Sequence, residues 1–379
     1  MVRIVQRKKS IFIKRFWLII FLILIFVFAK PYFTQKTTAT PPPANLPTLQ
    51  VLHVERIPEY SGRIQTHLFV PYWRLNPPYE APKVPNSTTT TIMYFAIHPN
   101  SDGTINTSEP GYTNLASFIH SSSASNLLTV SMQNEEISSA ILENSNLHTK
   151  LASKIMDVAL QHNFDGIVLD LEYAALPTKS VITDISAFTK TLSEEARAKN
   201  LSFSITLYGD TYYRSRPYDV KTLATYSDYI YIMVYDFHKS YGLPGPNFPL
   251  SLGSNKYEYS LESALDDFLK EVPTEKLIVT YGMFGYDWSV DDQNRPAKAA
   301  SARTLNQLEA QFFPNCTLAN CKVTIDPISA ETNVTYSEEN GQKHAVWFEN
   351  ERSLNTKISK MRTFGIQNVG IWAAGYYDN

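Results

Sequence analysis

Hydrophobic positions along residues 51–379 follow two alternating patterns. Short apolar runs rich in β-branched and aromatic residues recur eight times and predict buried strands. These runs span residues 67–72, 90–97, 127–132, 166–171, 202–207, 229–235, 277–281 and 369–372. Between the runs, apolar residues three and four positions apart predict amphipathic helices over residues 151–162, 181–199, 261–272 and 353–364.

Near-continuous apolar strands that alternate with helices are typical of a parallel sheet covered on its outer face. Eight such units predict an α/β fold, the (β/α)8 TIM barrel. An open, doubly wound sheet is the alternative, but no glycine-rich turn follows the first run. The segment 287–346 is too long for one crossover and contains strand-like pieces. We therefore expect a small α+β insertion between the seventh and eighth barrel strands.

The N-terminus has a different pattern, because Phe16–Ala29 is an uninterrupted, uncharged apolar run. A basic tail, residues 1–15, precedes it. This order predicts a transmembrane anchor over residues 16–33 with the tail in the cytoplasm. A cleaved signal peptide is the alternative, although Lys30 and Pro31 stand where small residues would mark a cleavage site. Residues 34–50 are rich in Thr and Pro, which predicts an extended linker.

The charge distribution agrees with this division. The chain has 34 Lys and Arg against 36 Asp and Glu, a net charge of −2, and 44% hydrophobic residues, which excludes wholesale disorder. Eight of the basic residues and none of the acidic ones precede Glu55, so the remainder carries 26 basic against 36 acidic residues. An acidic body is a poor nucleic-acid binder. We expect residues 51–379 to be extracytoplasmic and membrane-anchored, or secreted if the N-terminal segment is cleaved.

Two cysteines, Cys316 and Cys321, lie close together in the predicted insertion. In an oxidising compartment they could form a local disulfide, and two free thiols are the alternative. No further cysteine or histidine cluster accompanies them, and no cofactor motif is present. We therefore expect neither a metal nor a cofactor.

Candidate chemistry is concentrated in the fourth strand, where Asn163–Tyr173 reads NFDGIVLDLEY. Side chains alternate along a strand, so Val168, Asp170 and Glu172 share the face that points into the barrel. The two carboxyl groups then lie towards the carboxyl end of the strand, where barrel active sites are found. One carboxyl near another can be kept protonated as a general acid, as glycosidic bond cleavage requires. A solvated edge strand or a structural salt bridge is the alternative.

This motif resembles the D-G-x-D-x-D-x-E signature of glycoside hydrolase family 18, the chitinase-like family. The sequence matches at Asp165, Gly166, Asp170 and Glu172, and it departs at Val168, where the family usually has Asp.

Two further segments carry the resemblance. Met233–Asp236 is similar to the family motif M-x-Y-D on the sixth strand, and Trp372 occupies the place of the eighth-strand Trp. Residues 346–357 are similar to the approach to that strand in bacterial, cell-wall-associated members. The resemblance therefore implies that residues 51–379 form a catalytic barrel.

The resemblance implies a retaining, substrate-assisted mechanism, in which the substrate's own 2-acetamido group is the nucleophile. Glu172 would be the general acid and base, and Asp170 would orient the acetamido group. Tyr235 would hydrogen-bond the acetamido oxygen, and Asp236 would contact the sugar or Glu172. Trp372 would form the apolar floor below the sugar. We expect a monomer that cleaves β-1,4 linkages in an N-acetylglucosamine-containing polysaccharide, either chitin-like or peptidoglycan.

Other residues at strand ends are candidates for binding sugar rings, because aromatic faces stack on them. They are Tyr72, Trp73, Phe95, Gln133, Tyr208, Met233, Met283, Tyr286 and Trp288. The third strand lacks the Gly-Gly of many chitinases, which leaves peptidoglycan open as the polymer. Two alternatives to an enzyme remain: a non-catalytic, lectin-like barrel that binds chitin or peptidoglycan, and a partner-binding barrel with a vestigial site.

Overall fold

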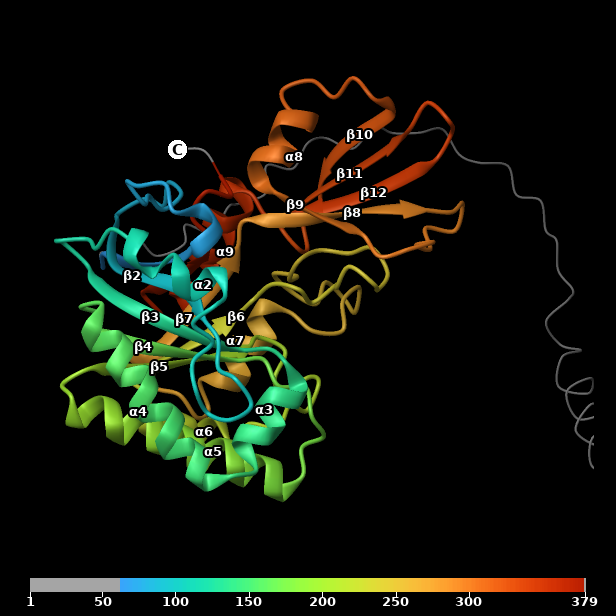
Figure 1. Ribbon diagram of the computed structural model, residues 1–379. Helices are drawn as coiled ribbons and strands as arrows, with labels where there is room; N and C mark the ends of the chain where they lie inside the picture. The colour runs from blue at the N-terminus through green and yellow to red at the C-terminus, as the bar shows by residue number, and fades with distance from the viewer. Residues whose placement is uncertain (1–61, 378–379) are drawn as a thin grey trace, which may run out of the picture. The chain divides into compact units, whose positions relative to one another are not determined.

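Eight parallel strands close into a barrel in the computed structural model, which describes residues 62–377 (Figure 1). Around the barrel the strands follow the order β1-β13-β7-β6-β5-β4-β3-β2. All eight predicted strands are confirmed. They are β1 (Ile64–Pro71), β2 (Ser87–Ile97), β3 (Ser125–Met132), β4 (Gly166–Leu171), β5 (Ser202–Tyr208), β6 (Tyr229–Met233), β7 (Leu277–Gly282) and β13 (Asn368–Trp372).

Helices cover the outside of the barrel. They are α2 (Pro110–Thr113), α3 (Glu135–Leu142), α4 (Ser145–Gln161), α5 (Lys179–Ala198), α6 (Val220–Tyr226), α7 (Leu261–Phe268) and α9 (Glu351–Thr363). The four predicted helices are confirmed, with two boundary corrections. Helix α4 begins six residues early, because the Asn144 side chain accepts a hydrogen bond from the Asn146 backbone and caps it. Helix α7 ends at Phe268, and a turn follows in which the Val272 N–H donates to the Phe268 carbonyl.

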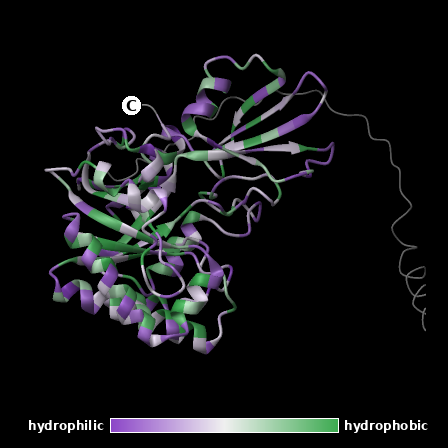
Figure 2. Ribbon diagram, viewed as in Figure 1, coloured by the Kyte–Doolittle hydropathy of each residue, from purple (hydrophilic) through white to green (hydrophobic). Residues whose placement is uncertain are grey.

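The core has two layers. The larger one lies between the strands and the helices, which explains why the strands are hydrophobic and the helices are striped (Figure 2). A smaller cluster fills the barrel interior, and it consists of Phe69, Met93, Phe95, Ala96, Leu127, Val168, Tyr231 and Ile278. Side chains therefore fill the barrel interior. The side chains above this cluster form the open end of the barrel.

A five-stranded antiparallel sheet is inserted between β7 and β13, as expected (Figure 1). It extends from residue 284 to residue 348, slightly beyond the predicted limits of 287 and 346. Its elements are β8 (Phe284–Val290), β9 (Ser301–Thr304), α8 (Leu305–Phe312), β10 (Ala319–Ile325), β11 (Thr332–Ser337) and β12 (Lys343–Phe348). A disulfide joins Cys316 to Cys321 at the entry to β10.

The predicted basic tail, membrane segment and linker, residues 1–50, lie outside the described residues. Within residues 62–377, none of the helices combines the length and the apolar character that crossing a membrane requires.

Candidate active site

The carboxyl ends of the barrel strands surround a cavity of about 350 Å³. Its position follows from the fold, because the loops after parallel strands all leave from this end of the barrel. Nine residues that the sequence singled out line it: Trp73, Phe95, Gln133, Asp170, Glu172, Met233, Tyr235, Asp236 and Trp372. The sequence motifs at the ends of β4, β6 and β13 therefore line the same cavity.

Asp170 lies at the bottom of this cavity with only 2% of its surface exposed. Its neighbours in the parallel ladder are Ser131 on β3 and Thr206 on β5. The Ser131 hydroxyl donates to Oδ2 at 2.8 Å, and the Thr206 hydroxyl donates to Oδ1 at 2.6 Å. Burial raises the pKa of the Asp170 carboxyl, and these hydrogen bonds oppose the rise by stabilising the carboxylate.

Glu172 follows β4 directly and is half-buried above Asp170. The Gln133 amide donates to Glu172 Oε1 at 2.7 Å, and the Tyr208 hydroxyl also donates to this carboxyl group. Burial, followed by the negative charge of Asp170, raises the pKa of Glu172 to about 7. Glu172 can therefore both donate and accept a proton near neutral pH.

Asp236 and Tyr235 come directly after β6. Asp236 has a φ of +57°, which aspartate tolerates better than most residues. Its Oδ1 accepts the Tyr286 hydroxyl at 2.8 Å, and its N–H donates to Asn247 Oδ1 at 3.3 Å. Burial raises the pKa of the Asp236 carboxyl. Burial and then the charge of Glu172 raise the pKa of Tyr235 well above its usual value, so its hydroxyl stays protonated as a donor.

An aromatic wall stands opposite these polar groups. The Trp372 ring centroid lies 4.6 Å from that of Phe95, 5.9 Å from that of Phe69 and 6.3 Å from that of Trp73. Trp372 is half-buried and Trp73 is 45% exposed. A cavity with carboxyl groups on one side and indole faces on the other matches a sugar ring, which is polar at its edge and apolar on its faces.

Val168 lies beneath Asp170 on the same face of β4. It is fully buried in the interior cluster, where its partners include Phe69 and Tyr231. The position of the family signature two residues before Asp170, usually Asp, is thus occupied by an apolar side chain among other apolar side chains. The groups that directly hold Asp170 are therefore the Ser131 and Thr206 hydroxyls and, at 3.5 Å, the Gln133 amide, rather than a second carboxyl group.

Several candidate residues lie elsewhere. Met283 is fully buried in the outer core, because its side chain points away from the cavity that its neighbour Phe284 lines. Tyr72 packs against the same core. Trp288 is fully buried in the inserted sheet. Tyr208 contacts Glu172, but Arg216 covers its ring at 3.6 Å from the centroid, so that face cannot stack on a sugar.

The structure adds residues that the sequence reasoning missed. Ser131 and Thr206 hold Asp170, while Phe69 and Phe284 line the cavity. The sequence carries no local signal for the first two, because their places beside Asp170 depend on the register of β3, β4 and β5. In the described part of the chain, no three His, Cys, Asp or Glu side chains are grouped as a metal site requires.

The family model described as Glycosyl hydrolases family 18 matches residues 67–377. The cortical fragment-lytic enzyme of Bacillus anthracis is 24% identical over 305 residues, which cover 76% of this chain and 66% of that protein. Across three Bacillus glycosylases that it matches, the chain spans about half to two thirds of their length.

Two solved structures share the fold. The spore cortex-lytic enzyme of Bacillus cereus superposes with a TM-score of 0.61 at 19% identity, covering 83% of this chain and 72% of that one. The class V chitinase of Nicotiana tobaccum gives a TM-score of 0.71 at 15% identity, covering 84% and 96%.

Proposed function

The chain belongs to family 18 of the glycosyl hydrolases, and from that membership we propose that it cleaves β-1,4 linkages next to N-acetylglucosamine with retention of configuration. The observation that carries the proposal is the Glu172 carboxyl group. It faces the cavity, and burial beside Asp170 raises its pKa to about 7. A general acid must hold a proton at the working pH and release it in the transition state, and a pKa near 7 satisfies both needs.

In the proposed first step, Glu172 transfers its proton to the glycosidic oxygen as the bond from that oxygen to the anomeric carbon breaks. The acetamido carbonyl oxygen of the same sugar forms the new bond to the anomeric carbon, which gives a cyclic oxazolinium ion. In the second step, the Glu172 carboxylate takes a proton from water while that water attacks the anomeric carbon and reopens the ring. The sugar leaves with its original configuration.

Asp170 has the role of orienting the acetamido N–H and balancing the positive charge of the ring. The hydroxyls of Ser131 and Thr206 suit it to this role, because both stabilise its carboxylate form. They also explain how the site can function with Val168 beneath Asp170. In this chain, neutral donors on the neighbouring strands hold Asp170, and Val168 occupies the position where other members have a second acid.

The other site residues bind the sugar in this proposal. Tyr235 donates its hydroxyl to the acetamido oxygen. Asp236, fixed by Tyr286 and Asn247, accepts a hydrogen bond from the sugar or from Glu172. Trp372 provides the apolar floor. A peptidoglycan-type polymer is supported by the relatives named for spore-cortex lysis, and a chitin-like polymer by the chitinase neighbours.

The Glu172→Gln variant tests this proposal. It keeps the size of the side chain and removes the acid, so hydrolysis of N-acetylglucosamine oligomers and peptidoglycan strands should fall by ~100-fold or more. The matched control is Glu194→Gln, on the exposed face of α5, which should retain full activity. Proton NMR of the first product should show the β-anomer. Equal activity in Glu172→Gln, or an α-anomer, contradicts the mechanism.

A lectin-like barrel is the second candidate, and the apolar Val168 at an acidic position is the observation that favours it. Binding of wild-type protein to insoluble chitin or cell wall without any soluble product identifies this function. We also propose that the barrel acts outside the cytoplasm, attached through its N-terminal segment. The disulfide between Cys316 and Cys321 supports an oxidising location. Proteolysis of intact cells that express the full chain tests it.

A further inference from the structure

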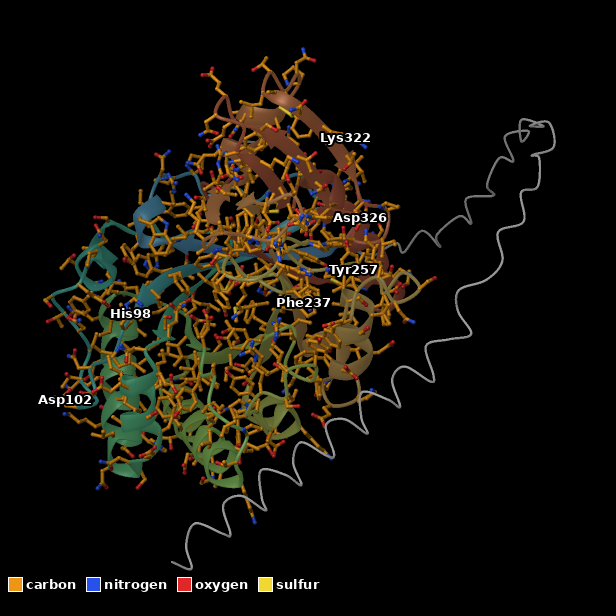
Figure 3. The ribbon with its side chains drawn as sticks, turned by 90° about the vertical axis from the view of Figure 1, so that its right-hand side faces the viewer. His98, Asp102, Phe237, Tyr257, Lys322 and Asp326 are labelled. Carbon is orange, nitrogen blue, oxygen red and sulfur yellow. A yellow bond between two sulfur atoms is a disulfide. The ribbon has the colours of Figure 1, made fainter. Side chains whose placement is uncertain are left out.

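A second cavity, of about 600 Å³, lies beside the proposed active site. Consecutive residues line the two cavities, since Asp236 lines the first and Phe237 the second. In Figure 3, Phe237, Tyr257 and Asp326 lie on one side of the molecule, away from His98 and Asp102. The lining of the second cavity includes Arg214, Arg216, Lys239, Lys256 and Glu258.

This wall is basic, although the chain beyond residue 50 has ten more acidic than basic residues. Four of the lining side chains are Lys or Arg, and Glu258 is the single carboxylate among them. Tyr213 donates its hydroxyl to Glu258, so this carboxylate already has a hydrogen-bond partner. Concentrated basic groups in an acidic protein therefore mark this cavity as different from the surrounding surface.

Two of the four cations share one counter-ion. Asp210, whose side chain is 5% exposed, pairs with Arg214 and also accepts Arg216 Nε at 3.0 Å. One negative charge thus faces two positive charges, so these three side chains have a net charge of +1. Lys256 is balanced separately, because its ammonium lies 2.8 Å from Asp326 Oδ1.

Lys239 is the remaining cation, and within residues 62–377 it forms no ion pair. Its ammonium lies 5.5 Å from the centroid of the Tyr208 ring, on which Arg216 also packs. Tyr208 in turn donates to Glu172. Burial raises the pKa values of both Glu172 and Asp236, and the positive charge of Lys239 opposes this rise, which places this ammonium close to the site of cleavage. Lys239 and Arg216 therefore both lie against Tyr208, the residue that hydrogen-bonds the proposed acid Glu172.

We propose that Lys239 and Arg216 bind an anionic group of the substrate, a carboxylate or a phosphate carried by a sugar next to the bond that is cleaved. This inference rests on the proposed function and names its substrate class, an amino-sugar polymer with a negative charge on its repeating unit. A neutral polymer would leave Lys239 without a partner. Arg216, whose side chain is 8% exposed and is held against the Tyr208 ring and Asp210, adds a fixed positive charge beside Lys239.

Binding measurements in the Glu172→Gln background test this without requiring turnover. Three ligands are compared by calorimetry: glycan strands of alternating N-acetylglucosamine and N-acetylmuramic acid with free carboxylates, the same strands with amidated carboxyl groups, and amidated strands bearing phosphate monoesters. The free strands should bind ~10-fold more tightly than the amidated ones, as expected for one charge-assisted hydrogen bond. Tight binding of only the phosphate-bearing strands would identify phosphate as the anion.

Adding Lys239→Gln to that background should remove the difference between anionic and amidated strands, and it should not affect folding because Lys239 forms no ion pair with any described residue. The control Lys154→Gln removes an exposed lysine on α4 and should retain the difference. Equal binding of all three ligands, or an unchanged preference for the anionic strands in Lys239→Gln, overturns the inference. Cleavage by the enzyme with Glu172 intact is measured separately. Anion-dependent binding without cleavage would refute the proposed function, and cleavage without anion preference would refute this inference alone.

Discussion

Lys357 on α9 has no exposed surface and lies between two buried carboxyl groups. Its ammonium is 2.7 Å from Glu331 Oε1 and 2.5 Å from Glu349 Oε2. Glu331 also accepts the backbone N–H groups of Asn247 and Phe248. The substitution Lys357→Met shortens the unbranched side chain by one atom and removes its charge, which leaves two acids facing each other in the core.

We expect this substitution to lower the free energy of unfolding by ~3–5 kcal/mol, because breaking a buried ion pair leaves uncompensated charge. Unfolding of about 320 residues has an entropy of roughly 0.7 kcal/mol/K, so the loss corresponds to a fall in Tm of about 4–8 °C. Burial already raises the pKa of Glu349 to about 7, against an ordinary value of 4.5. A carboxyl group whose pKa is higher in the folded than in the unfolded protein stabilises the fold at pH values below its unfolded pKa. This contribution is lost as the pH rises through 7. Removal of Lys357 should raise this pKa further, so the defect should be larger at pH 8 than at pH 5.5.

Differential scanning calorimetry at the two pH values measures both effects. Lys360→Met is the matched control, one turn along the same helix, where the lysine is 39% exposed and pairs with Glu262 at 2.6 Å. That surface pair should contribute less than ~1 kcal/mol. Adding Glu349→Gln to Lys357→Met should recover part of the lost stability. If Lys357→Met were no more harmful than Lys360→Met, or equally harmful at both pH values, the reasoning about buried charge would be refuted.

Three further predictions concern the active site. The rate of hydrolysis should fall as pH rises above about 7, because Glu172 must be protonated to act as the acid; a rate that stays constant to pH 9 would contradict this role. Val168→Asp places a carboxyl group among apolar side chains, so urea unfolding should show a free energy of unfolding lower by ~1–3 kcal/mol. An unchanged free energy of unfolding would mean that the barrel interior is hydrated. Trp372→Ala removes the apolar floor and should raise KM for oligosaccharides by ~10-fold with a smaller effect on kcat; an unchanged KM would show that the indole is only part of the core.

The fold could be predicted from the sequence because its signals are local. Each barrel strand is a short apolar run, and each is bounded by polar or turn residues. The acidic motif on β4 was equally readable, since alternation fixes which side chains share a face. The inserted sheet was recognised from the length of its segment, although its limits were placed a few residues inside the real ones.

The supporting contacts could not be predicted, because they join residues that are distant in the sequence. Nothing near Asp170 in the chain reveals that Ser131 and Thr206 hold it, since this depends on the register of three strands. Tyr208 was expected to present its ring to a sugar, but the structure covers one face with Arg216. Met283 was misplaced although simple alternation holds here: Leu277, Val279, Tyr281 and Met283 all belong to the outer core, whereas Ile278 belongs to the interior cluster.

The inserted sheet has a consequence for engineering this barrel. Tyr286, which fixes Asp236, belongs to β8, and Glu331, which binds the backbone of the loop after β6, directly precedes β11. The insertion is therefore not a removable module. A shortened enzyme without residues 284–348, or a chimaera carrying the equivalent sheet of a relative, would lose two supports of its catalytic loop at once. Variation in this sheet offers an indirect route to altered catalysis, in which the catalytic residues themselves stay the same.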